Sequence, residues 1–84
     1  MKNLKVLIVE DEQKLANLIR NSIKELFFKV AISKDSIDGI KKFKSFKPDI
    51  VISDISMPNL SGLEMCKIIK SNNQTPLLII SYVN

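Results

Sequence analysis

The sequence predicts an α/β fold built on a doubly wound parallel sheet, and two observations carry this prediction. Four short runs rich in Val, Ile and Leu alternate along the chain with three segments of helical periodicity. The runs are almost continuously apolar, which is typical of strands buried on both faces of a parallel sheet. Alternating strands and helices form βαβ units, whose right-handed crossovers place helices on both faces of the sheet.

The four predicted strands are bounded by polar residues and turn formers. They span residues 5–9, 30–33, 50–53 and 77–80. Pro48 and Asp49 precede the third run, and Thr75 and Pro76 precede the fourth. The second run is the least apolar of the four.

The first two helices are predicted over residues 12–27 and 36–46. In the first, side chains suited to an inward face recur at three- and four-residue spacing, namely Leu15, Leu18, Ile19, Ser22, Ile23 and Leu26. In the second, the side chains expected to point inward are Ile37, Ile40 and Phe43. Pro48 stops this helix, because a proline cannot continue it.

The third helix is predicted to begin near Ser61 and to end at the polar residues 71–73. Ser61 is followed three residues later by Glu64, which is the spacing of a capping box. The apolar face is expected to comprise Leu63, Cys66 and Ile69, flanked by Met65 and Ile68. Lys67 and Lys70 are expected to face solvent.

Length and composition indicate one globular domain, or part of one, over residues 1–84. The chain is 45% hydrophobic and 26% charged, so it has enough apolar side chains to form a core. A chain of 84 residues buries a smaller share of its surface than a typical domain, and its stability is therefore expected to be marginal. The sequence has no internal repeat and no linker.

The net charge of +4 raises the question of nucleic-acid binding. Much of the excess lies in Lys41, Lys42, Lys44 and Lys47, around the second helix. A phosphate-binding surface would need arginines, aromatic residues or a recognition helix, and the sequence has one Arg and no such motif. We interpret these lysines as a solvated helix face.

The single cysteine and the absence of histidine limit the chemistry of the chain. Cys66 alone excludes an internal disulfide and fits a reducing compartment, and its place on an apolar helix face favours a small buried side chain. With no His, the commonest general base and metal ligand is missing. No run has membrane-spanning length and no signal peptide is evident, so we expect a cytoplasmic protein without membrane contact.

Polar side chains follow three of the predicted strands where each strand ends. Glu10 and Asp11 follow the first, Asp54 follows the third, and Ser81 follows the fourth. Ligands of open parallel sheets bind beyond the carboxyl ends of the strands, so we expect the three acids to converge there. Acids after strands are also common as helix caps, and Asp11 by itself could favour the start of the first helix.

Three carboxylates in one small volume repel one another. Either one of them retains a proton at a raised pKa or a cation lies among them. Oxygen ligands without His or an available Cys favour magnesium over zinc. A magnesium ion held by few carboxylates keeps positions that phosphate oxygens can take.

Three blocks of the chain resemble the receiver domain of bacterial two-component response regulators. Residues 6–12 resemble the first strand and acidic pair of the family. Residues 48–58, with Gly62, resemble the phosphoacceptor strand and its loop in the pattern D-x-x-M-P-x-x-x-G, and residues 76–81 resemble the fourth strand. The resemblance covers the entire chain and implies a flavodoxin-like sheet.

The resemblance also implies roles for individual residues. Asp54 is the nucleophile that receives a phosphoryl group from a histidine kinase. Asp11 and Asp54 bind Mg²⁺ directly, Glu10 binds it directly or through water, and the backbone carbonyl of Ser56 completes the protein ligands. Ser81 donates its hydroxyl to a phosphoryl oxygen. The protein is then a phosphoacceptor that loses its phosphate slowly to water, rather than a turnover enzyme.

The chain departs from the family pattern after Ser81. A fifth strand with its Lys and aromatic switch residue is absent, together with two further helices, so we expect an incomplete receiver fold. The fourth strand would then be an exposed apolar edge, which predicts that the chain self-associates, exchanges elements between chains or folds only in part. Any contact with DNA is expected only through an output domain that this chain lacks. Tyr82 stands where the family has a small residue, and its ring either hinders access to the acceptor or packs on the surface.

Two other functions are compatible with parts of the pattern. A pseudo-receiver would keep the fold and act as an interaction module without phosphate, which the absent Lys and Tyr82 favour and the acidic residues oppose. A phosphatase-like hydrolase with an aspartate nucleophile would carry D-x-D-x-[TV], and here Ser56 replaces the second acid.

Overall fold

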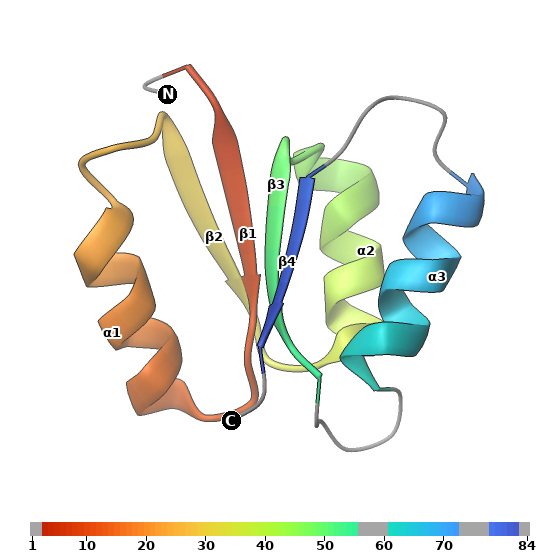
Figure 1. The fold of residues 1–84 in the computed structure, drawn as a ribbon. Coiled ribbons are helices and arrows are strands. Elements are labelled where there is room, and N and C mark those ends of the chain that lie inside the picture. The colour runs from red at the N-terminus through yellow and green to blue at the C-terminus, as the bar shows by residue number, and fades with distance from the viewer. Residues whose placement is uncertain (1–2, 56–60, 73–77, 83–84) are drawn as a thin grey trace.

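The computed structural model describes residues 3–55, 61–72 and 78–82, which form a parallel sheet with helices on both faces (Figure 1). The strands in these ranges are β1 (Lys5–Val9), β2 (Lys29–Ser33), β3 (Ile50–Asp54) and β4 (Leu78–Tyr82). The helices are α1 (Gln13–Ile23), α2 (Ser36–Phe46) and α3 (Gly62–Asn72). The predicted order of strands and helices is confirmed, and β1 and α2 have the predicted bounds.

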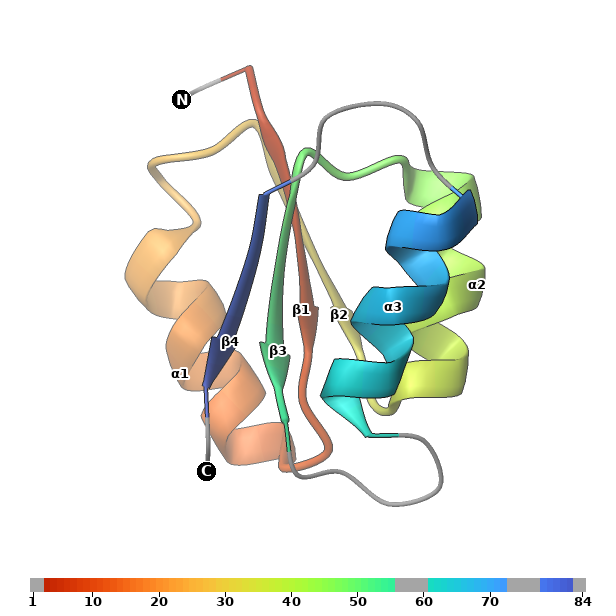
Figure 2. The same ribbon diagram turned by 45° about the vertical axis from the view of Figure 1, so that its right-hand side comes forward.

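All strand pairs of the described sheet are parallel, and the strand order is β2-β1-β3-β4. The order reverses between β1 and β3, because the chain first adds β2 on one side of β1 and then crosses to the other side. This reversal creates the point at which ligands of such sheets bind. Helix α1 covers one face, while α2 and α3 lie together on the other (Figures 1 and 2). The predicted doubly wound α/β fold is confirmed.

The central strand β1 is buried on both faces. Its side chains from Val6 to Val9 are fully buried, as the continuous apolar run predicts. On the α2 and α3 side, the core cluster comprises Leu7, Val9, Val51, Met65 and Ile69. Cys66 packs against this cluster as a half-buried free cysteine.

The inward face of α3 differs from the predicted one. Met65 and Ile69 are buried in the core, whereas Leu63 is 52% exposed. Residues four apart lie on one stripe of a helix, and the stripe that contacts the sheet is the one shared by Met65 and Ile69. The prediction that Leu63 faces the core is therefore wrong.

Helix α2 packs closely because Gly39 faces the core. A Cβ atom at Gly39 would lie 3.0 Å from both Met65 Sδ and Val9 Cγ2. Ser36 and Gly39 are the buried residues of α2, and Ile37, predicted to point inward, is 49% exposed. Apolar spacing correctly predicted that Ile40 and Phe43 face the core, against which both pack. It missed Ser36 and Gly39, because these buried residues are small rather than hydrophobic.

Helix α1 is shorter than predicted, and part of its predicted apolar face is exposed. It ends at Ile23 instead of continuing to residue 27, and residues 24–28 form turns and bends. Ala16 is buried, while Leu18 and Leu26, both predicted on the inward face, are 64% and 54% exposed. The helix contacts β1 and β2, so apolar residues outside that contact remain in water.

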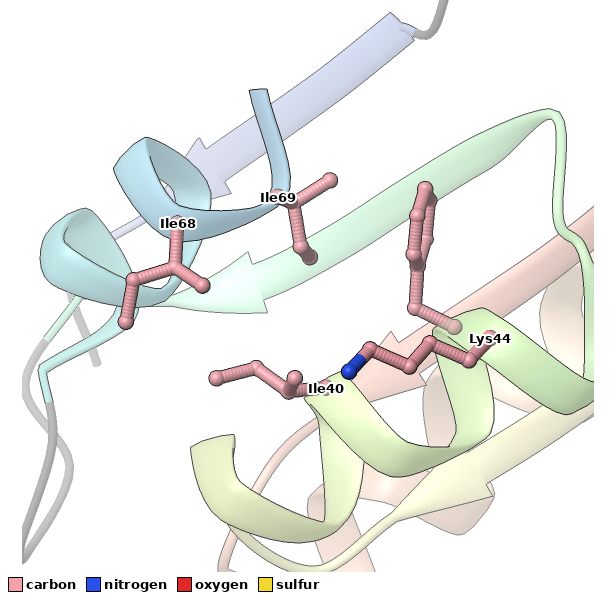
Figure 3. A pocket seen from close by; sticks show the side chains of 5 residues that line it. Ile40, Lys44, Ile68 and Ile69 are labelled. Atoms are coloured by element: carbon pink, nitrogen blue, oxygen red, sulfur yellow. The ribbon is translucent and has the colours of Figure 1, made fainter. Parts of the chain in front are cut away.

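A small apolar hollow of about 70 Å³ lies between α2 and α3 (Figure 3). Its lining residues are Ile40, Phe43, Lys44, Ile68 and Ile69. The aliphatic part of Lys44 covers apolar surface there, as long cationic side chains commonly do.

The lysines around α2 lie mainly in solvent. Lys41, Lys44 and Lys47 are exposed, and Lys42 forms an ion pair with Asp38 at 3.3 Å. None of the helices in the described ranges has the length and apolar character that a bilayer crossing demands.

Candidate metal centre

The carboxylates of Glu10, Asp11 and Asp54 meet at the carboxyl end of the sheet. Each offers one oxygen, and these oxygens all lie within 4.8 Å of one another. Strands β1 and β3 are neighbours, and their register pairs Val9 with Ser53, so the acids that follow these residues lie side by side. The convergence predicted from the strand ends is found. The roles of the three acids as ligands and acceptor stay predictions.

Two of the three acids are buried. Glu10 and Asp54 are each 1% exposed, while Asp11 is exposed and borders solvent. The position of Glu10 is fixed through its backbone, because its N–H donates to the Ser33 carbonyl at 3.0 Å. Buried carboxylates are costly unless they are paired, hydrogen-bonded or bound to a cation.

The electrostatics of Glu10 reflect this crowding. Burial raises the pKa of the Glu10 carboxyl, and the neighbouring Asp11 and Asp54 raise it further. Hydrogen bonds from the Tyr82 hydroxyl and from the Glu12 backbone N–H oppose the rise. A divalent cation among the three acids would remove the repulsion that favours the protonated form.

Gly62 allows the start of α3 to approach the end of β3. Its N–H donates to the Ile55 carbonyl at 3.0 Å, and a Cβ atom on Gly62 would lie 2.1 Å from the Asp54 carbonyl oxygen. A side chain at this position would therefore displace the backbone that carries Asp54.

Ser61 caps α3 as predicted. Its hydroxyl accepts from the Glu64 N–H at 3.1 Å and donates to the Glu64 carboxylate at 3.2 Å. This cap fixes the point at which the helix begins beside the acidic site.

Tyr82 belongs to the site, whereas the sequence suggested only that its ring hinders access to the acceptor or packs on the surface. It is the last residue of β4, pairs in register with Asp54, and donates its hydroxyl to Glu10 Oε1. Burial raises the pKa of the phenol, and the hydrogen bond to Glu10 adds to this, so the hydroxyl remains a donor. The interpretation that the ring only packs on the surface is wrong. The signal that pointed to Tyr82 was its departure from the family pattern.

Two predicted site residues are described in part or not at all. Ser56, whose carbonyl was predicted to bind the metal, lies outside the described residues. Ser81 lies in β4 in register with Ser53, and its side chain is outside the description.

The donor set fits magnesium. Within the described residues it comprises three carboxylates, in a group where burial and like charge oppose the ionisation of Glu10. Hard oxygen ligands with no nitrogen or sulfur among them suit Mg²⁺ or a similar cation.

Comparison with known proteins assigns the family. The sequence model of the response regulator receiver domain matches residues 6–84. The chain belongs to this family. The fold, with its acidic site at the carboxyl end of β1 and β3, agrees with that membership.

Curated relatives of this receiver domain include response regulators named ArlR. The ArlR of Staphylococcus saprophyticus is 40% identical over 77 residues, covering 92% of this chain and 35% of the relative. The ArlR of Staphylococcus aureus strain Mu50 is 37% identical over 76 residues, covering 90% of this chain and 35% of the relative. The chain thus spans about a third of the length of these relatives.

Solved structures share the fold over nearly the whole of this chain. The N-terminal domain of an uncharacterized protein from Wolinella succinogenes has a TM-score of 0.83 and 36% identity, over 96% of this chain and 66% of that one. The response regulator TrrA from Thermotoga maritima, in complex with Mg(2+)-BeF, has a TM-score of 0.84 and 29% identity, over 93% of this chain and 69% of that one.

Proposed function

We propose that this receiver domain is the phosphoacceptor module of a two-component response regulator, phosphorylated on Asp54 by a sensor histidine kinase with Mg²⁺. The observation that carries the proposal is the position of Asp54. It is buried at the end of β3, with a carboxylate oxygen within 4.8 Å of oxygens from Glu10 and Asp11. The TrrA complex with Mg(2+)-BeF supports a magnesium site in a related protein.

Asp11 and Asp54 would hold the ion directly, Glu10 directly or through water, and the Ser56 carbonyl would complete the set. When bound, Mg²⁺ cancels the repulsion between the Asp54 carboxylate and an anionic phosphoryl donor. Asp11 is exposed, so the site borders solvent on its side.

Asp54 acts as the nucleophile in the proposed step. One carboxylate oxygen attacks the phosphorus of a phosphohistidine, and the new O–P bond gives an aspartyl phosphate. The P–N bond of the donor breaks, its electron pair returns to the imidazole nitrogen, and that nitrogen takes up a proton from water. The Ser81 hydroxyl would donate to a phosphoryl oxygen, and slow attack by water would return Asp54 to the carboxylate.

The cellular setting follows from the same proposal. If a sensor histidine kinase phosphorylates the domain, we expect the domain to be cytoplasmic. The chain spans about a third of its ArlR relatives, so contact with DNA would belong to an output domain in the remainder of a whole regulator. The phosphoacceptor would not be a turnover enzyme, because the phosphoryl group is transferred to the protein itself and is lost only slowly to water.

Incubation with acetyl phosphate and Mg²⁺, followed by intact-protein mass spectrometry, tests the proposal. We expect a mass gain of one phosphoryl group that disappears with a chelator and in Asp54→Asn. The matched control is Asp49→Asn, which changes an exposed acid at the opposite end of β3. Asp49 accepts a hydrogen bond from the Lys5 N–H at 2.9 Å, which an asparagine oxygen can also accept.

Three outcomes would count against phosphorylation at Asp54. A folded chain that gains no mass would favour a pseudo-receiver that acts without phosphate. A gain that persists in Asp54→Asn would place the acceptor elsewhere. A gain that does not need a divalent ion would remove the role assigned to the three acids.

A further inference from the structure

Tyr82 links the last described strand to the acidic site through two hydrogen bonds. Its hydroxyl donates to Glu10 Oε1, and its backbone carbonyl accepts from the Ile55 N–H at 2.7 Å. Ile55 directly follows Asp54. One residue of β4 is therefore bonded both to an acid after β1 and to the backbone next to the acceptor after β3.

The register shows where the Tyr82 ring lies. Tyr82 pairs with Asp54, and residues paired in a parallel sheet project from the same face. Glu10 lies beyond β3, directly after the neighbouring strand β1. The half-buried side chain must therefore extend from β4 past the position of Asp54 to reach Glu10, over about two strand spacings of 4.8 Å each.

Both oxygens of the Glu10 carboxylate accept hydrogen bonds. Oε1 accepts from the Tyr82 hydroxyl, and Oε2 accepts from the Glu12 N–H at 3.0 Å. Two donors on the two oxygens set the plane of the carboxylate as well as its position. Glu12 belongs to the same loop as Glu10, whereas Tyr82 comes from 72 residues further along the chain. The orientation of Glu10 thus depends on the docking of β4.

We propose that Tyr82 is a positioning residue of the metal centre, which orients Glu10 for the ion through its hydroxyl. This inference rests on the proposed function, because it takes Mg²⁺ as the ligand of the three acids. Partners that orient a metal ligand or its bound water commonly change metal affinity when they are removed. A Glu10 carboxylate that lacks the Tyr82 donor has more orientations to lose on binding.

Magnesium binding to the metal-free chain tests the role of the hydroxyl. Isothermal titration calorimetry of Tyr82→Phe, which removes one oxygen and keeps the ring, is expected to show an affinity for Mg²⁺ about tenfold weaker. The matched control is Ser22→Ala, which removes an exposed hydroxyl that donates to the Leu18 carbonyl on α1, away from the acids. It is expected to bind Mg²⁺ like the parent chain.

The fluorescence of Tyr82 provides a second measurement, which does not require a substitution of Tyr82. The chain has one Tyr and no Trp, so its intrinsic tyrosine emission comes from residue 82 alone. A hydrogen bond from the phenol to a carboxylate quenches this emission. We expect Mg²⁺ to change the emission of the parent chain, and Glu10→Gln to change it in the absence of metal.

The outcomes separate this inference from the function on which it rests. A parent chain that binds no Mg²⁺ would overturn both. A parent chain that binds Mg²⁺, with equal or tighter binding by a folded Tyr82→Phe, would overturn the role of Tyr82 and leave the metal site in place. The proposed role of Tyr82 would also be overturned if its emission responds neither to Mg²⁺ nor to Glu10→Gln. This outcome decides the matter even where Tyr82→Phe does not fold.

Discussion

Gly62 lies directly against the backbone of Asp54, since a Cβ atom on Gly62 would meet the Asp54 carbonyl oxygen at 2.1 Å and Ser53 Oγ at 2.8 Å. The start of α3 and the end of β3 are thus in contact through main-chain atoms. A backbone oxygen within a strand cannot move aside as a flexible side chain can. The contact therefore constrains both the stability of the chain and the position of the Asp54 carboxylate.

Gly62→Ala is expected to lower the free energy of unfolding by about 1–3 kcal/mol, as overpacking of a tight contact commonly does. Urea denaturation followed by circular dichroism measures this loss. The matched control is Gly39→Ala, where the nearest atoms belong to the side chains of Met65 and Val9 at 3.0 Å. Side chains can adjust and alanine favours the helix interior, so Gly39→Ala should cost less. Equal losses at the two positions would contradict this account.

Ser61→Ala is expected to destabilise α3 by about 1 kcal/mol, because the Glu64 N–H loses its acceptor. Ser61→Asp should recover most of the loss, since aspartate is also a good N-cap and its charge favours a helix N-terminus. Urea denaturation measures both variants. An alanine variant as stable as the parent would show that the cap contributes nothing.

The stability of the metal-free chain is expected to depend on pH through Glu10. Its pKa in the folded chain is raised above the ordinary 4.5, so the folded state holds this proton more tightly than the unfolded state does. The contribution of Glu10 to stability is fully present at pH values below the ordinary pKa. It is lost as the pH rises through the raised pKa of the folded state. Urea midpoints of the parent chain and of Glu10→Gln, compared across this interval, isolate the contribution.

Magnesium should reverse the direction of this pH effect. Protons and the ion compete for the same carboxylates, so stabilisation by Mg²⁺ grows as the pH rises. If the difference between the parent chain and Glu10→Gln does not change with pH, the pKa of Glu10 is not raised by folding. If added Mg²⁺ leaves the urea midpoint unchanged at neutral pH, the acids do not bind it.

The edge strand β4 is expected to promote self-association of the 84-residue chain. It lies at one end of the described strand order, and Ile80 is 46% exposed. An exposed apolar edge strand can pair with another chain. Light scattering over a range of concentrations should show association that Ile80→Lys weakens. The control is Leu63→Lys, which adds the same charge at an exposed apolar position on α3. A compact monomer at high concentration would contradict the expectation.

Much of the fold follows from local pattern. The continuous apolar run of β1 predicts a strand buried on both faces, and the structure confirms both its bounds and its burial. Helix α2 has the predicted bounds, because Asp35 caps its start by accepting from the Asp38 N–H and the chain turns at Lys47 before Pro48. The meeting of Glu10, Asp11 and Asp54 was also predictable, since carboxyl ends of parallel strands share one edge.

The tertiary structure decided which side chains are covered and which residues meet across the sheet. Leu18, Ile37 and Leu63 fit helical periodicity and are nevertheless exposed, because periodicity shows a face but not the neighbour that covers it. The bond between Tyr82 and Glu10 joins residues 72 positions apart and depends on the register of β4 against β3. The hydrophobic pattern of each strand restricts its register to those that bury its apolar face, but which residues then meet across three strands is decided only when the sheet assembles.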